Sequence, residues 1–342
     1  MAQPSSAASQ APPHATLPHG CKGLDDVDIV PGRSVSAVSQ QLLQGCIRRT
    51  FTEAGSVTQL IRQGADPRAI GNLRVRGPTV TPYWRYNCPS FAIDSPTNYP
   101  LLYADGEDGY DVRVSLPQWS SRELQQDIIN ALIDGGADVN RGGGSESPIK
   151  VAIAAGNLTA VDALLARQVD VRGFTVMRLP YIHDAAPPAT REYEAALMSV
   201  YRRLVQHDNT LAAQRTAHGF NLVHLAAEAP SIFSQSFIDQ YLTLITSHGA
   251  DMTATDTGWT PLHIAAWRGS PYVAEWLCRR LPAEDINRGR PPQPHRTPLA
   301  MAADRFDFFA RQQQERQQTE GGSRHIRQQK ATIGVLLRSG AA

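Results

Sequence analysis

The chain has 342 residues and a formal net charge of +1 at pH 7, because its 33 lysine and arginine residues nearly balance its 32 aspartate and glutamate residues. This balance argues against a protein that binds nucleic acid or an acidic membrane surface, since electrostatic binding of either needs a clustered basic excess. No apolar run approaches the ~18 residues that can span a bilayer. The four cysteines lie far apart without a CxxC pair, which favours a reducing compartment, and we expect a cytoplasmic protein.

The first segment, residues 1–36, is rich in alanine, serine, proline and glutamine. It has no charged region followed by an apolar run, which argues against an ordinary secretory signal peptide, and its composition predicts a disordered leader. Two interpretations stay open. The leader is either a terminus without a role, or the start of a bacterial effector that is secreted into a host cell without a cleaved signal peptide and binds a host protein there.

Two helical stretches in the first half of the chain end in a similar turn. The first helical pair spans Val38 to Ile61 and leads into Gly64-Ala65-Asp66. An apolar stripe over residues 128–133 leads into Gly136-Ala137-Asp138, and the helix that carries it opens at Ser120, where the sequence has the spacing of a capping box. The shared ending indicates that one structural unit is repeated.

A long interruption, residues 71–117, separates these two stretches. It is dense in proline and glycine and is predicted to be a loop. Aromatic side chains in the region 83–119 form either a small core that fastens the loop down or a recognition surface, and both interpretations stay open. The tyrosines and the tryptophan of this interruption are Tyr83, Trp84, Tyr86, Tyr99, Tyr103 and Tyr110.

In the second half of the chain, a short pattern recurs at the starts of helices. In its best copy, Thr260 can cap the free N–H groups of a helix, Pro261 suits the first helical position, and Gly269 ends the helix. Apolar residues from Val273 to Leu281 then form one stripe of a second amphipathic helix. Weaker copies of the pattern start at Ser147, Asn221 and Thr297.

Helix pairs this short cannot bury their apolar stripes alone, so the units must stack on one another. The stretch from Thr260 to Ala266, followed by Gly269, resembles the ankyrin repeat signature, and about seven such units, the degenerate ones included, cover the chain from Val38 to Ala342. The resemblance implies an all-α fold, an ankyrin repeat solenoid of stacked helix-turn-helix units in one domain over residues 37–342. We expect long insertions in this domain at residues 71–117, 174–190 and 306–330.

The last of these insertions, residues 306–330, is rich in arginine and glutamine. It either lengthens a helix or forms a mobile basic arm, and a charge run of this kind is usually a solvated face.

No combination of residues points to catalysis. The chain has no GxGxxG motif after a strand, no P-loop, no HExxH and no GxSxG, and its histidines lack metal-ligand spacing. His224 and His263 stand at the histidine position of the signature, where the side chain is expected to hydrogen-bond within the turn region. We therefore expect no enzyme, no cofactor and no metal site. The alternative is an enzyme or ligand-binding protein whose pocket is built jointly by residues 71–117 and 174–190.

The resemblance also implies where a partner would bind. In ankyrin repeats, the residue before the Thr-Pro pair and the two residues before the helix-ending glycine usually face a concave groove that binds proteins. Carried over position by position, these are Phe220, Glu228, Trp259, Trp267, Arg268, Arg296, Asp304 and Arg305.

Tryptophan and arginine dominate interface energetics, at ~2 kcal/mol or more for a truncated hot-spot side chain. The alternative interpretation is that Trp259 and Trp267 pack on each other or on a neighbouring repeat. We expect a monomeric, non-enzymatic adaptor that binds a partner protein, although the sequence does not identify that partner.

Overall fold

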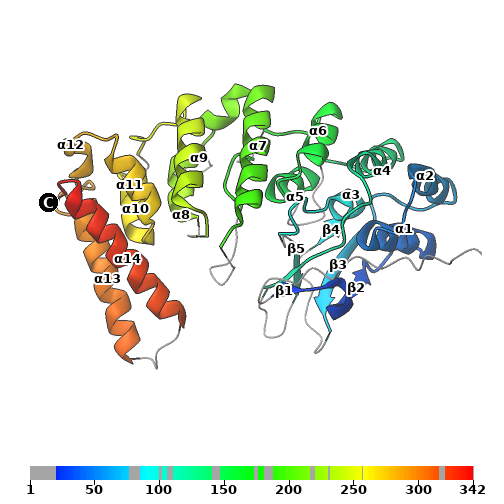
Figure 1. The fold of residues 1–342 in the computed structure, drawn as a ribbon, viewed down its shortest axis with the longest axis horizontal. Coiled ribbons are helices and arrows are strands. Elements are labelled where there is room, and N and C mark those ends of the chain that lie inside the picture. The colour runs from blue at the N-terminus through cyan, green and yellow to red at the C-terminus, as the bar shows by residue number, and fades with distance from the viewer. Residues whose placement is uncertain are drawn as a thin grey trace, which may run out of the picture.

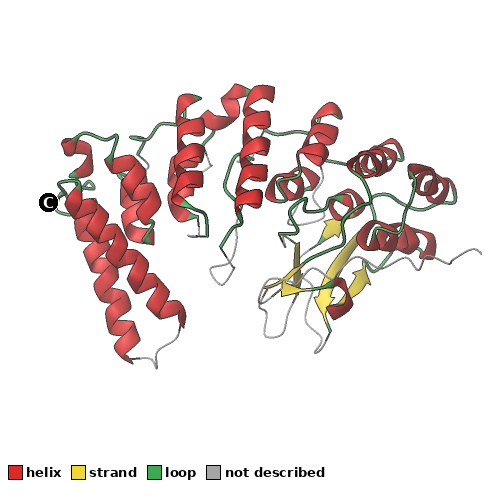
Figure 2. Ribbon diagram, in the orientation of Figure 1, coloured by secondary structure: helices red, strands yellow, loops and turns green. Residues whose placement is uncertain are grey.

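A computed structural model describes residues 21–76, 85–99, 102–105, 111–140, 147–172, 176–180, 188–215, 220–229, 232–255, 257–315 and 320–341. Over these residues the chain forms a row of helix pairs with a small sheet beside the first pairs (Figures 1 and 2). The predicted stack of helical units is confirmed. The sheet is an addition that the all-α prediction does not contain.

Each unit of the stack consists of an inner and an outer helix. The described pairs are α1 (Ala37–Arg48) with α2 (Ala54–Arg62), α3 (Cys88–Ala92) with α4 (Arg122–Asp134), α5 (Pro148–Ala154) with α6 (Leu158–Ala166), α8 (Leu222–Glu228) with α9 (Gln235–Ser247), α10 (Pro261–Arg268) with α11 (Pro271–Cys278), and α13 (Pro298–Glu315) with α14 (Glu320–Arg338). The helix α7 (Arg191–His207) is the outer helix of one more unit. Outer helices contact the outer helices of the next unit throughout the described stack. Inner helices do the same from α1 to α5 and from α8 to α13, so that equivalent positions line up within each of these two runs.

The starts of the inner helices form as the sequence predicts. At α10, the Thr260 hydroxyl accepts a hydrogen bond from the backbone N–H of His263 at 3.3 Å, and the ring Nδ1 of His263 lies 2.8 Å from the same hydroxyl. Asn221 takes the place of threonine at α8 and accepts from the N–H groups of Val223 and His224 at 3.1 and 3.3 Å. An asparagine cap therefore preserves the geometry of the unit.

The start of α4 differs by one residue from the prediction. Ser121, not Ser120, caps this helix, and its hydroxyl accepts from the N–H of Leu124 at 3.1 Å. Neighbouring serines both offer a capping oxygen, so the sequence identifies the helix start only to within a residue.

The prediction of a disordered leader over residues 1–36 does not hold for residues 21–31. Strand β2 (Val27–Pro31) pairs antiparallel with β3 (Ile70–Val75), and Val27 is buried. The partner strand lies far along the chain, so local composition does not reveal the pairing. Residues 1–20, and with them most of the leader, lie outside the described residues.

The insertion at residues 71–117 is likewise not the loop that was predicted. It contributes most of β3, together with β4 (Tyr86–Asn87), α3, β5 (Leu102–Asp105) and β6 (Asp111–Val114). Strand β1 (Cys21–Lys22) and the short helix η1 (Leu24–Asp26) precede β2, and the strand order is β1-β6-β5-β3-β2, with β4 paired to β3. Because α3 is the inner helix of the second unit, this insertion is partly repeat and partly sheet.

The aromatic side chains of this insertion that the structure describes form a core. Tyr86 and Tyr99 are buried, and Tyr99 stacks on Tyr193 of α7 with ring centroids 4.2 Å apart. Tyr83, Trp84, Tyr110 and the side chain of Tyr103 lie outside the described residues. For Tyr86 and Tyr99, the prediction of a small core is therefore the correct one of the two.

A buried carboxylate fastens the insertion to the repeats. Asp94 follows α3 and accepts hydrogen bonds from the backbone N–H of Trp119 (2.9 Å) and from the side chains of Arg122 (2.5 Å), Gln125 (3.1 Å) and Asn157 (3.1 Å). These donors come from the second and third units. A buried charge needs this number of partners to offset its desolvation.

The region 174–190 is described only in part. Over residues 176–180 the chain forms a turn, and Val176, Met177 and Leu179 are buried. The turn is held by two buried tyrosines of the outer row. The hydroxyls of Tyr201 and Tyr241 donate to the carbonyls of Arg178 and Met177 at 3.0 and 2.6 Å. The rest of the described chain contains the short helices η3 (Asn209–Ala213) and α12 (Ala283–Ile286).

The third insertion, residues 306–330, lengthens the last helix pair. Gly269 ends α10 in the left-handed conformation at φ 71°, whereas Phe306 stands at the equivalent position of α13 and the helix continues to Glu315. Helix α14 starts correspondingly early, at Glu320. Figure 1 shows the resulting helical hairpin and the sheet at opposite ends of the stack, extending from the same side of it. Helix extension, and not a mobile arm, is thus confirmed for the described residues.

Candidate partner-binding surface

The site residues expected from the sequence lie at the ends of inner helices in the last units of the stack. Glu228 ends α8, Trp259 precedes the capping residue of α10, and Trp267 and Arg268 end α10. Arg305 lies inside α13, because that helix continues past the equivalent end. Since α8, α10 and α13 contact one another in this order, these residues are neighbours across units.

The two tryptophans contact each other. Their rings meet edge to face, with centroids 6.1 Å apart and an interplanar angle of 82°. This is a favourable aromatic geometry, and it agrees with the interpretation that the two rings pack together. Both rings are nevertheless only half-buried, so each keeps a surface that a partner can contact.

Charged members of the set pair across and within units. Arg268 lies 3.1 Å from Glu228 of the preceding unit, and Arg296 lies 3.6 Å from Asp304. Partly exposed ion pairs of this kind are worth about 1 kcal/mol or less.

Arg305 has a different environment. Its guanidinium carbon lies 4.7 Å from the ring centre of Trp267, 4.9 Å from that of Phe308 and 4.4 Å from that of Phe309. Burial, and then the nearby charge of Arg268, lower the pKa of Arg305 from its ordinary value. We name these four residues, Trp267, Arg305, Phe308 and Phe309, the Arg305 cluster.

Phe220 joins the set through the signature histidine. Its ring packs against that of His224 with centroids 5.1 Å apart, and Nε2 of His224 lies 3.2 Å from the carbonyl oxygen of Trp259. The structure therefore brings the expected residues into one continuous row from α8 to α13. We call this row the α8–α13 surface.

Sequence reasoning missed three members of this surface. Arg290 stacks over Trp259 at 4.6 Å, and Phe308 and Phe309 complete the Arg305 cluster. The two phenylalanines follow Arg305 by three and four residues, the spacing at which side chains meet on a helix. That signal has meaning only if α13 continues past residue 306, which the repeat pattern does not predict.

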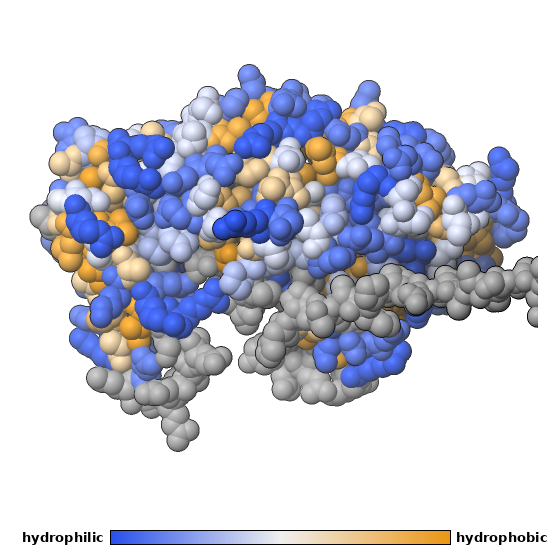
Figure 3. Space-filling model, in the orientation of Figure 1, coloured by the Kyte–Doolittle hydropathy of each residue, from blue (hydrophilic) through white to orange (hydrophobic). Residues whose placement is uncertain are grey.

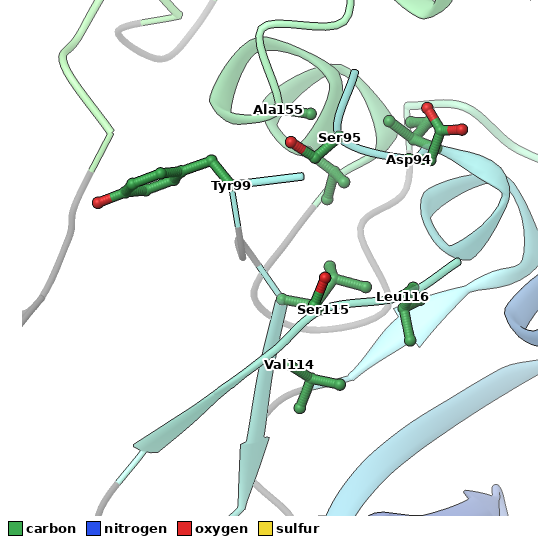
Figure 4. A pocket seen from close by; sticks show the side chains of 10 residues that line it. Asp94, Ser95, Tyr99, Val114, Ser115, Leu116 and Ala155 are labelled. Atoms are coloured by element: carbon green, nitrogen blue, oxygen red, sulfur yellow. The ribbon is translucent and has the colours of Figure 1, made fainter. Parts of the chain in front are cut away.

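A small cavity lies between the insertion and the third unit (Figure 4). Its volume is about 20 Å³, and Asp94, Ser95, Tyr99, Val114, Ser115 and Ala155 are among its lining residues. A cavity of this size holds about one water molecule, far less than the ~300 Å³ or more of typical small-molecule sites. It lends no support to an enzymatic pocket at this insertion.

The surface of the molecule has no dominant apolar area on the face in Figure 3, where hydrophobic residues lie in small groups among hydrophilic ones. In the part of the chain that the structure describes, no cluster of histidine, cysteine, aspartate and glutamate has the makings of a metal site. Among the described helices, none combines the length and apolar character that a membrane crossing needs.

Comparisons with the sequences of known proteins agree with the repeat architecture. Residues 239–277 match the family model of ankyrin repeats. Two proteins of Microplitis demolitor bracovirus (isolate Webb), I-Kappa-B like protein F2 and I-Kappa-B like protein I1, are 31% and 30% identical to this chain over 121 residues, which is 34% of this chain and 68% of each viral protein. Among solved structures, the human ASB11 ankyrin repeat domain aligns over 90% of this chain and 99% of its own, with 14% identity and a TM-score of 0.43.

Proposed function

Because the chain belongs to the ankyrin repeat proteins, we propose that it is a non-enzymatic adaptor that binds a partner protein through the α8–α13 surface. Ankyrin repeats generally mediate protein–protein interaction. The observation that carries the proposal is the row of half-buried tryptophan and arginine side chains that spans consecutive units. These are the residue types that supply most of the binding energy at protein interfaces.

The packing of the insertion supports this location. In the first units, the insertion lies against the inner helices: a Cβ added at Gly71 of β3 would overlap Leu43 of α1, and Leu102 and Val114 line the same cavity as Val151 of α5. The chain's own strands thus cover inner helices there. The inner helices α8, α10 and α13 lie beyond the sheet (Figure 1) and carry the row of aromatic and charged side chains.

Affinity capture with the full chain as bait tests the proposal. Bait proteins are the unmodified chain, the double variant Trp259→Ala/Trp267→Ala, and the control Tyr272→Ala, which removes an aromatic ring that is 39% exposed on the outer helix α11. We expect mass spectrometry to identify a protein that the unmodified chain and the control recover and the double variant loses. Equal recovery by all three baits, each shown by circular dichroism to be folded, would contradict binding at this surface.

The proposal has two further parts. We propose that the protein acts in the cytoplasm, on the basis of its unpaired cysteines, and that it acts as a monomer. Size-exclusion chromatography with light scattering measures the second part directly, and a dimer at micromolar concentration would contradict it.

A further inference from the structure

The α8–α13 surface contains two arginines that stack on aromatic rings. Arg305 is held among the rings of Trp267, Phe308 and Phe309, which come from two units, and Arg290 stacks on Trp259. Stacking fixes the plane of a guanidinium, and the N–H donors at its edge stay available for an acceptor. Each tryptophan of the surface therefore presents a pre-oriented cation beside it.

Neither of these stacked cations has a carboxylate partner among the residues that the structure describes, whereas their neighbours do. Arg268 pairs with Glu228, and Arg296 pairs with Asp304. No aspartate or glutamate oxygen of the described chain lies within 4.0 Å of Arg305 or Arg290. In addition, Nε of Arg290 is buried and has no hydrogen-bond partner.

This part of the surface therefore carries more positive than negative charge. Burial and the positive charge of Arg268 both act against the charged form of Arg305, and no anion of the described chain compensates for them. A carboxylate that docks here would gain from charge-assisted hydrogen bonds to a partly desolvated guanidinium, where electrostatic interactions are stronger than in bulk water. A lysine from a partner would instead be repelled.

We propose that the partner presents an acidic segment to this surface, and that Arg305 and Arg290 bind its aspartate or glutamate side chains. This inference rests on the proposed function, because it specifies the chemistry of the partner at the same surface. The bound carboxylates would complete the row of ion pairs that Glu228 and Asp304 begin within the chain. The neighbouring rings would pack against the apolar parts of the segment.

Selection of random peptides on the purified full chain provides the probe. We expect the selected peptides to be enriched in aspartate and glutamate. The best peptide, labelled with fluorescein, is then titrated with the unmodified chain, with Arg305→Gln and with Arg311→Gln. Arg311 is an exposed residue of the same helix, so the control removes the same charge outside the Arg305 cluster.

Fluorescence anisotropy should show Kd rising about tenfold or more for Arg305→Gln, because a hydrogen bond to a charged group is worth about 1.5–3 kcal/mol. Arg311→Gln should change Kd by less than about twofold, as for an exposed charge. The variant Arg305→Lys keeps the positive charge but lacks the planar guanidinium group with its paired N–H donors. Its Kd should lie between those of the unmodified chain and Arg305→Gln.

The outcomes separate the two proposals. Peptides that lose binding in Trp259→Ala/Trp267→Ala, but are not acidic and bind Arg305→Gln normally, would overturn the acidic partner and leave the binding surface intact. If no selected peptide is sensitive to the tryptophan substitutions, the proposed function fails as well. Tight binding of a labelled single-stranded oligonucleotide that Arg305→Gln abolishes, without acidic peptide binding, would assign the cations to nucleic acid instead.

Discussion

The signature histidines show how one side chain closes a unit of this protein and contacts the next. His224 touches its own capping residue Asn221 through Nδ1, at 2.8 Å, and the carbonyl of Trp259 in the following unit through Nε2, at 3.2 Å. His263 makes the same contact with its capping residue, Thr260, and is fully buried. Burial is the main reason that the pKa of His263 falls to about 4. The ring is therefore neutral in the folded protein at pH 7.

This neutral, buried ring gives the protein a predictable response to acid. The pKa of His263 is lower in the folded chain than the ordinary value of ~6.5 in an unfolded one, so the unfolded chain binds the proton more strongly. The free energy of unfolding should fall as the pH decreases from about 6.5 to about 4, and His263 should add nothing further below that. A shift of this size corresponds to a loss on the order of 3 kcal/mol.

Urea unfolding measured between pH 7 and pH 4 tests this prediction. The variant His263→Gln should show a shallower decrease with falling pH than the unmodified chain, whatever its stability at pH 7. The exposed His295 supplies the control His295→Gln, which should keep the original slope. If His263→Gln and the unmodified chain have parallel pH profiles, the buried histidine is not the cause.

At the scale of helices and turns, the residue at the end of an inner helix determines where that helix stops and what can pack beside it. Gly269 ends α10 in the left-handed conformation that glycine adopts without strain. The space beside it is filled by Gln329 of α14, whose side-chain amide donates to the carbonyls of Ala266 (2.6 Å) and Ala302 (3.3 Å). One glutamine thus ties the last outer helix to two inner helices.

The substitution Gly269→Ala should therefore cost more than backbone strain alone. An added Cβ would overlap Oε1 of Gln329, and moving that side chain would disturb both of its hydrogen bonds. Gly340, after α14, has a similar φ of 81° with nothing within 4 Å of an added Cβ, so Gly340→Ala measures the strain by itself.

We expect Gly340→Ala to lower the free energy of unfolding by about 1 kcal/mol, and Gly269→Ala to lower it by a further 1 kcal/mol or more, on the order of an overpacking penalty. Chemical denaturation of both variants measures the difference. Equal losses would mean that Gln329 moves aside without cost.

At the scale of the whole molecule, the stack is a row of units in which most helix–helix contacts join neighbouring units. We expect the fourth unit, whose outer helix is α7, to be the weak position in this row, because the described residues 176–180 before α7 form a turn and not a helix. Tyr201 and Tyr241 compensate by donating to carbonyls of that turn. Burial raises the pKa of both phenols above the ordinary value, so their hydroxyl protons stay in place as donors.

The double substitution Tyr201→Phe/Tyr241→Phe should weaken the coupling between the two halves of the stack, which are the units up to α6 and the units from α8 onward. The lost hydroxyls leave the buried carbonyl of Met177 and the partly buried carbonyl of Arg178 without their donors, at a cost of up to about 1–3 kcal/mol each. In urea, we expect unfolding followed by tryptophan fluorescence, which reports mainly on Trp259, Trp267 and Trp276, to separate from unfolding followed by circular dichroism, which reports on all helices.

The control for this prediction is Tyr272→Phe, which removes a hydroxyl from a ring that is 39% exposed on α11. It should leave the two transitions where they are in the unmodified chain. If the two transitions of the double variant coincide, the turn does not couple the two halves. The contacts of α7 with α6 and α9 would then be enough to couple them.

The sequence by itself determined the repeating unit of this protein. Capping residues such as Thr260 and the helical spacing of apolar residues act within one or two turns of a helix, so they can be read locally. For the same reason, the residues expected at the ends of the inner helices were found next to one another once the units had stacked.

Only the tertiary structure decided the sheet and the Arg305 cluster. Strand β2 pairs with β3 across a long stretch of chain, and no local pattern in residues 21–31 shows that partner. Phe308 and Phe309 reach Arg305 only because α13 continues past Phe306, and Trp267 joins them from the preceding unit. Pairing and packing between distant segments depend on the completed stack, whereas capping and spacing depend on neighbouring residues, and this difference separates what could be predicted from what could not.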